Sequence, residues 1–313
     1  MVEAVFERSF YVRNAHCGLL CIGGSGIGAG PLNCVCDATA DVDWRDQDVR
    51  QGLRGHFDTN RLYLDANLSF DVSSASPWAP PAFPSEWRPD KVGAGINALS
   101  MAIAQLDSVA SGLMSFVFPN HPVGSSDHTY LHSAISRRAG RAVSATGNWL
   151  DGVVRQKEAD IPQEMLDLVG LGQGLTPSGD DFLGGVLVAL HAFEYTAARK
   201  RLADKLLRYA QGRTNAISYV HLCSAAEGQG AAVLHDMMIA LCTGDREKIE
   251  SILPAVDAIG HSSGWDALAG IATVLLAVCG REAQSLGPRN FAPEGNRHPG
   301  KRDSVYPGSR SYD

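Results

Sequence analysis

Residues 178–185 read SGDDFLGG, and residues 263–270 read SGWDALAG. Both segments fit the pattern S-G-x-D-x-L-x-G, and each runs directly into an apolar stretch. A hydroxyl residue and an acid ahead of an apolar run are typical of the polar start of a buried helix. If the two starts meet, two Ser/Asp sets and two helix N-termini share one place, which predicts a site for an oxyanion, with or without a metal. The alternative is that each copy is an ordinary capping box, whose Leu and second Gly only pack the helix.

The stretch before the first copy contains residues that a simple helix cap does not require. Residues 171–181 read LGQGLTPSGDD. The glycines allow positive φ or a close approach of the backbone to a ligand. Thr176 or Ser178 is expected to cap the helix, and Asp181 to complete a capping box. We therefore predict that small and hydroxyl residues of this stretch bind an anion: Gly172, Gly174, Thr176, Ser178 and Gly179.

Two adjacent acids, Asp180 and Asp181, refine the predicted chemistry. Two carboxylates beside a helix N-terminus repel a bare phosphate, so a bridging Mg²⁺ or a cationic partner is implied. We assign both acids to catalysis and to a magnesium site. The alternative is that they only complement the helix dipole.

The second copy follows a histidine, because residues 260–266 read GHSSGWD. We assign Asp266 to catalysis and His261 to proton transfer, since an imidazole titrates near neutral pH. A histidine beside a helix start also serves as a surface or cap residue, and that alternative stays open. The residues predicted here to bind the anion are Ser262, Ser263 and Gly264.

A third polar helix start reads QGRTNAIS over residues 211–218. The planar guanidinium of Arg213 suits a carboxylate or a phosphate, and Thr214 or Asn215 is expected to cap the helix. We predict that Arg213, Thr214 and Asn215 join the same anion site. His221, further along this helix, is interpreted as a structural histidine.

The pattern of the chain changes along its length and predicts an α+β fold. Residues 1–90 are expected to form a β-rich N-terminal domain, because short β-prone runs alternate with Gly, Asp, Asn and Pro. Residues 91–280 are expected to form a mostly α-helical domain that carries the ligand site. Residues 281–313 contain few large apolar residues and are predicted to be a disordered tail.

Periodicity and turn residues give approximate bounds for the individual elements. A proline-rich linker is expected at Ser74–Pro89. The expected strands are Val5–Tyr11, Gly18–Ile22, Cys34–Cys36 and Arg61–Leu68. The expected helices are Ala94–Gly112, Ser126–Leu150, Pro162–Val169, Gly179–Tyr195, Ala197–Gln211, Asn215–Glu227, Ala231–Cys242, Asp245–Ala258 and Gly264–Cys279.

A glycine-rich loop, GGSGIGAG over residues 23–30, satisfies a relaxed dinucleotide-binding pattern. That fingerprint must open a helix, whereas the PLNCVC that follows has the character of a strand. We therefore predict a connection between two strands, whose backbone amides can still hold an anion. A stand-alone nucleotide- or anion-binding protein is kept as an alternative function on this basis.

Composition excludes several classes of protein. The net charge is −7 and no basic cluster is dense, which argues against a nucleic-acid partner. The longest apolar runs, Phe182–Phe193 and Ala267–Cys279, are too short and too glycine-interrupted for a membrane span. The N-terminus lacks the features of a signal peptide. Seven cysteines, an odd number, favour reduced thiols and a cytoplasmic location. A zinc set of Cys17, Cys21, Cys34 and Cys36 is less favoured than buried thiols.

Three motifs together resemble a known family. Residues 170–185, residues 213–218 and residues 260–266 are similar to the signatures of a bacterial family formerly of unknown function and once labelled as carboxylases. That family includes the H subunit of the oxamate carbamoyltransferase of allantoin degradation. The GLTPSGDDFL core is the specific part of the resemblance, which extends over most of residues 10–280.

The resemblance implies a subunit of a multi-subunit, cytoplasmic carbamoyltransferase. Such an enzyme converts oxamate and carbamoyl phosphate to oxalurate and phosphate, with magnesium as the implied cofactor. The implied partners are the other subunits and a small anionic substrate, either carbamoyl phosphate or a ureido acid. A non-catalytic scaffold or regulatory subunit of the same complex is the alternative.

Overall fold

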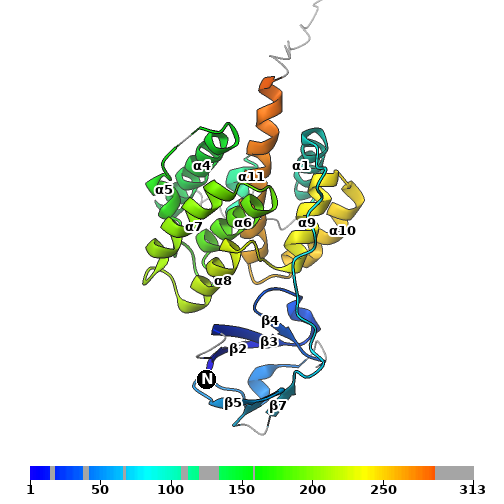
Figure 1. Cartoon of the computed structure of the whole chain (residues 1–313), viewed down its shortest axis with the longest axis vertical. Helices are drawn as coiled ribbons and strands as arrows, with labels where there is room; N and C mark the ends of the chain where they lie inside the picture. Colours follow the sequence, from blue (N-terminus) through cyan, green and yellow to red (C-terminus); the bar gives the residue numbers. More distant parts are fainter. Residues whose placement is uncertain are drawn as a thin grey trace, which may run out of the picture.

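The computed structural model describes residues 1–14, 18–37, 42–65, 68–106, 112–119, 134–157 and 159–285. Strands occupy the first part of this chain and helices the remainder, which confirms the α+β fold class. Figure 1 shows the two parts one above the other, joined by a long extended segment along one side. We call them the β region, residues 1–71, and the helical region, residues 89–285.

The β region contains two small sheets. One has the strand order β1-β2-β3-β4, and the other has the order β5-β6-β7. All neighbouring strands are antiparallel except β3 and β4, which are parallel. The strands are β1 (Val2–Val5), β2 (Ser9–Asn14), β3 (Gly18–Gly23), β4 (Asn33–Val35), β5 (Gly55–Asp58), β6 (Arg61–Leu64) and β7 (Leu68–Asp71).

Three aromatic rings meet in the otherwise aliphatic core of the β region. The ring centroid of Phe10 lies 5.1 Å from that of Trp44 and 5.9 Å from that of Phe70. Because Phe10 belongs to β2 and Phe70 to β7, these contacts hold the two sheets together.

Strand prediction was right in position and wrong in number. The single run predicted at Val5–Tyr11 spans the end of β1, a tight turn and the start of β2, and the turn closes with a hydrogen bond from Phe6 N to Ser9 O. The run predicted at Arg61–Leu68 likewise covers β6 and the first residue of β7. Strand β5 was missed because its sequence, GHFD, is mostly polar.

The glycine-rich loop connects two strands, as predicted. It leaves β3, makes a short 3₁₀ turn at Ser25–Ile27, and returns to the parallel strand β4. The helix that a dinucleotide fingerprint requires does not follow this loop, since β4 begins at Asn33.

The helical region is built around its last helix. Helix α11 contacts α1, α2, α4, α6, α9 and α10, and Figure 1 shows it running through the middle of the region. The helices are α1 (Pro89–Ile103), α2 (Met114–Val117), α4 (Ala134–Val154), α5 (Gln163–Leu166), α6 (Ser178–Ala192), α7 (Thr196–Ala210), α8 (Ala216–Ala226), α9 (Ala232–Thr243), α10 (Arg246–Asp257) and α11 (Ser263–Ser285).

Most helix predictions lie within a few residues of the observed bounds, and the exceptions have local causes. Helix α1 begins at Pro89, which suits the first helical turn because proline lacks an amide hydrogen that would need a partner. Its end at Ile103 falls well before the predicted Gly112. Helix α2 was missed because it has only four residues. Part of the predicted helix Ser126–Leu150 lies outside the described residues.

Helix α11 differs from its prediction at two points. It continues past residue 281, where the disordered tail was predicted to begin, and ends at Ser285; residues 286–313 lie outside the described part. Its window Ser263–Gly280 is also long and apolar enough, by length and composition alone, to cross a membrane. Within the structure 78% of that window is buried, as in the central helix of a globular domain.

The predicted proline-rich linker forms an extended strap between the two regions. Residues 72–88 run along the helical region (Figure 1), and their aromatic side chains pack onto it. Phe83 and Trp87 both contact Phe193 at the end of α6, with ring centroids 5.0 and 4.8 Å apart. Trp78 lies beside His235 of α9.

Helices α6 and α11 touch through glycine. A Cβ atom added to Gly185 would lie 2.0 Å from the carbonyl oxygen of Ala267, and one added to Gly270 would lie 2.0 Å from that of Phe182. Position eight of each S-G-x-D-x-L-x-G segment therefore faces position five of the other. This reciprocal contact gives the helix pair an approximate two-fold symmetry and requires that both positions lack a side chain.

We expect Gly185→Ala and Gly270→Ala each to destabilise the protein by about 3 kcal/mol or more, because the new methyl group overlaps backbone atoms. Gly184→Ala is the matched control, since its Cβ would have Ala225 Cβ as nearest neighbour at an ordinary 3.7 Å. The control is expected to be neutral or to gain up to about 1 kcal/mol of helix propensity. Urea unfolding measures all three, and equal effects at positions 184 and 185 would contradict the packing described.

Candidate functional site

The two helix starts meet. The hydroxyl of Ser263, at the start of α11, lies against the carboxylate of Asp181 in α6, and the hydroxyl of Ser178 lies against that of Asp266 in α11. Position one of each repeat thus faces position four of the other, with the same reciprocity as the glycine contacts one turn further on. The helices must therefore run in the same general direction, with their N-termini adjacent.

Hydroxyl groups link the loop before α6 to the start of α11. Thr176 Oγ1 lies 2.8 Å from Ser263 Oγ. Gly172 has φ 125°, and a Cβ there would lie 2.7 Å from the amide nitrogen of Ser178. The loop therefore folds back onto the helix start, and the positive φ predicted for Gly172 and Gly174 is observed.

The capping prediction for α6 was wrong. Its N-cap residue is Pro177, and neither Thr176 nor Ser178 caps the helix with its side chain. Their hydroxyls lie against Ser263 and Asp266 of the other repeat instead. At α8, by contrast, Asn215 accepts hydrogen bonds from the backbone amides of Ile217 and Ser218, as predicted.

Asp180 is buried and fully engaged within the protein. It accepts hydrogen bonds from the amide of Gly170 at 2.9 Å, from Ser218 Oγ at 2.6 Å, and from Thr214 Oγ1. These donors join the loop before α6 to the start of α8. Asp180 therefore holds three segments together and has little capacity left for a ligand.

Asp181 and Asp266 differ from Asp180 because each keeps one oxygen without a partner. The Oδ2 atoms of both residues are buried and accept no hydrogen bond. The other oxygen of Asp266 accepts from the amide of Leu113 at 2.6 Å. Buried acceptors without partners are rare in folded proteins, so these two atoms mark a place where a donor is expected.

Burial keeps protons on this pair at unusually high pH. It raises the pKa of Asp266 to about 6, against the opposing effect of the Leu113 amide and of the hydroxyls of Ser178 and Ser262. Burial also raises the pKa of Asp181 well above its ordinary value, and the negative charges of Asp266 and Asp180 add to the rise.

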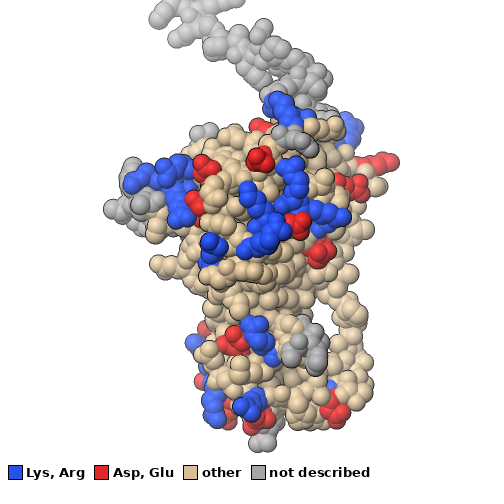
Figure 2. Space-filling model, turned by 60° about the vertical axis from the view of Figure 1, so that its left-hand side comes forward, with Lys and Arg blue, Asp and Glu red and all other residues tan. Residues whose placement is uncertain are grey.

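A cavity of about 1120 Å³ lies between the two regions, and Asp181 is in its wall. Thr176 and Ser263 line it beside Asp181, and Gly26–Gly30 of the glycine-rich loop line the side that belongs to the β region. On the face seen in Figure 2, the junction between the regions is covered mainly by uncharged residues.

Two residues that the sequence did not single out for function complete the cavity near Asp181. Tyr11 of β2 and His221 of α8 meet across the junction, with Tyr11 Oη 3.5 Å from His221 Nε2. Burial lowers the pKa of His221 to about 4, and burial together with Cys21 raises that of Tyr11. Both are therefore neutral at pH 7. No motif marks either residue, because only the contact between the two regions brings them together.

Arg213 and His261 lie at the surface, and Thr214 and Asn215 are also outside the cavity wall. The guanidinium of Arg213 stacks on the Tyr209 ring, 4.2 Å from its centroid, and donates to Tyr209 O at the surface. His261 is exposed and is not in the cavity wall. Ser178, Ser262 and Asp266 lie behind Asp181, and Gly172, Gly174, Gly179 and Gly264 shape the backbone around it. The third helix, α8, thus lines the cavity through Ser218 and His221, but Arg213 does not.

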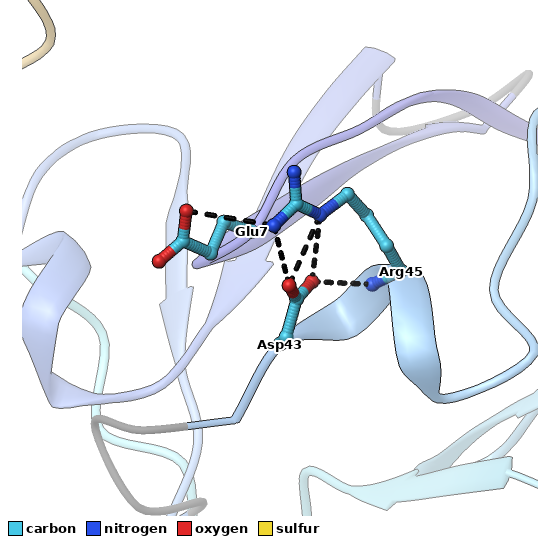
Figure 3. A network of polar contacts seen from close by, with 3 residues as sticks. All are labelled: Glu7, Asp43 and Arg45. Atoms are coloured by element: carbon cyan, nitrogen blue, oxygen red, sulfur yellow. Dashed lines mark hydrogen bonds and ion pairs between the residues drawn. The ribbon is translucent and has the colours of Figure 1, made fainter.

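Cationic side chains line the cavity at the β region and α10. Arg8, Arg45 and Lys248 are in its wall. Arg45 is paired with Asp43, at 2.5 Å, and with Glu7, at 3.5 Å (Figure 3). Arg8 donates to Ala258 O across the junction, and within the described residues neither Arg8 nor Lys248 forms an ion pair.

These features define a two-region α+β protein with a ligand cavity at the junction, walled by paired helix starts and a glycine-rich loop. Residues 168–275, about a third of the chain, match the family model described as "Oxamate carbamoyltransferase subunit AllH". The matched segment contains both repeats, and it is similar to the family that the motifs predicted. No solved structure matches the chain.

The raised pKa of Asp266 predicts a pH-dependent stability. Between about pH 4 and pH 6 the folded state keeps a proton on Asp266 that the unfolded state has lost. The stability that Asp266 contributes is therefore fully present below pH 4 and declines until the pH passes about 6. The shift from 3.8 to about 6 corresponds to about 3 kcal/mol. Asp266→Asn mimics the protonated acid. As the pH rises from 4 to 7, the free energy of unfolding of this variant is therefore expected to increase by up to that amount relative to wild type. Urea unfolding at both pH values measures the difference, and a constant difference would contradict this origin.

Replacement of Asp180 should affect folding more than replacement of Asp181. Asp180→Ala leaves three donors without an acceptor and is expected to cost about 3 kcal/mol or more. Asp181→Asn replaces an acid whose ionised form burial disfavours, and it leaves stability near neutral pH unchanged or higher. Thermal unfolding of the two variants at pH 7 tests this order, which the reverse ranking would overturn.

Proposed function

We propose that the chain is a catalytic subunit of an oxamate carbamoyltransferase-like complex, and that its active site is the cavity at the junction of the two regions. The family match supports membership of such a complex. The observation that carries the catalytic assignment is Asp181, whose buried carboxylate has an unpartnered oxygen and stands in the wall of this cavity.

The reaction needs a group that accepts a proton from nitrogen. In the forward direction the amide nitrogen of oxamate attacks the carbonyl carbon of carbamoyl phosphate, a C–N bond forms, and the C–O bond to phosphate breaks. The nitrogen must lose one proton as it attacks. A carboxylate with a raised pKa is suited to take that proton near neutral pH, which is the role proposed for Asp181.

The surrounding residues can supply position and a dry environment. Thr176 and Ser263 fix one side of Asp181, and Tyr11 and His221 close the cavity from the β region and α8. Neutral Tyr11 can donate a hydrogen bond to a developing oxyanion. Because these groups belong to different regions, the site is complete only when the regions are docked.

Magnesium was predicted at Asp180 and Asp181, and the donor set fits it poorly. The oxygens of Asp180 are taken by protein donors. The described residues also contain no group of three or more His, Cys, Asp or Glu side chains placed to hold a metal ion. Magnesium therefore stays a prediction, and no step of the reaction is assigned to it here.

The scaffold function is the competing proposal. The exposed positions of Arg213 and His261 favour it to the extent that both were expected to act on the ligand. In a scaffold the reciprocal Ser/Asp contacts would only align α6 and α11, and partner subunits would carry the chemistry. It accounts less well for a carboxylate oxygen left unpartnered beside a large cavity.

Asp181→Asn separates the two proposals when it is measured in the assembled complex. A catalytic role predicts a fall in kcat of about 100-fold or more, with normal folding and assembly. Asp204→Asn, the same change at an exposed site on α7, is the matched control and should keep full turnover. Turnover is followed as phosphate release from carbamoyl phosphate with oxamate as acceptor. Full activity of the Asp181 variant would reject the catalytic proposal in favour of a scaffold.

A further inference from the structure

We propose that Asp181 makes the cavity selective for a ligand group that donates an N–H hydrogen bond, and that it rejects an isosteric group bearing only oxygen acceptors. This inference rests on the proposed function, because it concerns the ligand of the same cavity. It goes further by stating which end of an amide-containing acid lies at α6 and α11, and by naming the residue that decides between two ligands of nearly equal shape.

The first reason is a local excess of acceptors. Asp181 and Asp266 each have a buried Oδ2 atom without a donor. The hydroxyls of Thr176 and Ser263 lie beside Asp181, and those of Ser178 and Ser262 beside Asp266, but neither Oδ2 atom accepts a hydrogen bond from them. A ligand atom seated against Asp181 must therefore donate a hydrogen bond, or the acceptor stays unsatisfied at a cost.

The second reason is charge. Two helix N-termini supply roughly half a positive charge each, but Asp180, Asp181 and Asp266 stand in the same two helix starts. Within the described part, no lysine or arginine forms an ion pair with these acids, and Arg213 lies at the surface against Tyr209. A carboxylate or phosphate placed against Asp181 would therefore meet repulsion, whereas a neutral amide nitrogen would not.

The third reason is the distribution of charge over the rest of the cavity. Arg8 and Lys248 line its wall and form no ion pair in the described residues, whereas Arg45 is already paired with Asp43 and Glu7 (Figure 3). Residues 26–30 of the glycine-rich loop are in the same wall. The anionic end of a ligand thus finds its complement on these residues, which leaves the nitrogen end for Asp181.

Oxamate and oxalate form the discriminating pair. The two differ by one group, since an NH₂ in oxamate is replaced by a carboxylate oxygen in oxalate. A site built to accept a hydrogen bond from a ligand rejects an analogue without the donor more strongly than a shape difference could. We expect the dissociation constant for oxalate to exceed that for oxamate by about 100-fold or more.

Asp181→Asn should shift this preference, because an asparagine amide can donate to a ligand oxygen as well as accept. We expect the oxalate-to-oxamate ratio of dissociation constants to fall at least about tenfold in the variant, through tighter oxalate binding and weaker oxamate binding. Asp204→Asn on α7 should leave the ratio unchanged, since it adds the same amide far from the cavity.

The test is calorimetric titration of the assembled complex with oxamate and with oxalate, for wild type and both variants, at one pH and ionic strength. The selectivity would be overturned by an unchanged ratio in Asp181→Asn, or by equal binding of both ligands to wild type. The proposed active site would still stand if Asp181→Asn loses turnover. Failure of both ligands to bind the wild-type complex would overturn both proposals. A lowered ratio with normal turnover would sustain the selectivity and reject only the catalytic role.

Discussion

The close crossing of α6 and α11 is the constraint on which the remaining structure depends. Backbone touches backbone at Gly185 and Gly270, so the two helices cannot slide or rotate against each other without a collision. This fixed crossing explains why the same eight-residue pattern occurs twice. Each copy supplies a glycine that admits the other helix, and a serine that faces the other helix's aspartate. The reciprocal contacts between the two helices thus account for the sequence similarity of the two copies.

The same crossing separates three acids that are similar in sequence but not in surroundings. Asp180 faces away from the helix pair, toward α8 and the loop before α6, and its charge is met by three donors. Asp181 and Asp266 face the crossing, where desolvation raises the pKa of both. One acid with all its acceptors used and two with an unpartnered oxygen therefore arise from neighbouring positions on two helix starts.

The sequence predicted the parts of this site that depend on local pattern. Helix starts, the positive φ of Gly172 and the cap at Asn215 follow from rules within a few residues, and each is observed. The sequence did not predict that the two repeats meet. It predicted an oxyanion site only if they do. Arg213 was misplaced in the site because its stacking partner, Tyr209, lies one helical turn away on the same chain segment and competes for the guanidinium. Tyr11 and His221 are about two hundred residues apart, and no local rule joins them.

The order of the helices along the chain has a consequence for how the protein is made. Among the described helices, the central helix α11 is the last to leave the ribosome, and it supplies Asp266, Ser263 and the packing surface for six other helices. Until it emerges, α6 lacks the partner that its glycine surface requires, and the apolar faces of the earlier helices stay uncovered. The cavity wall and the core of the helical region thus form only after α11 has been synthesised. A chain that stops before α11 lacks both Ser263 in the cavity wall and the surface on which the other helices pack.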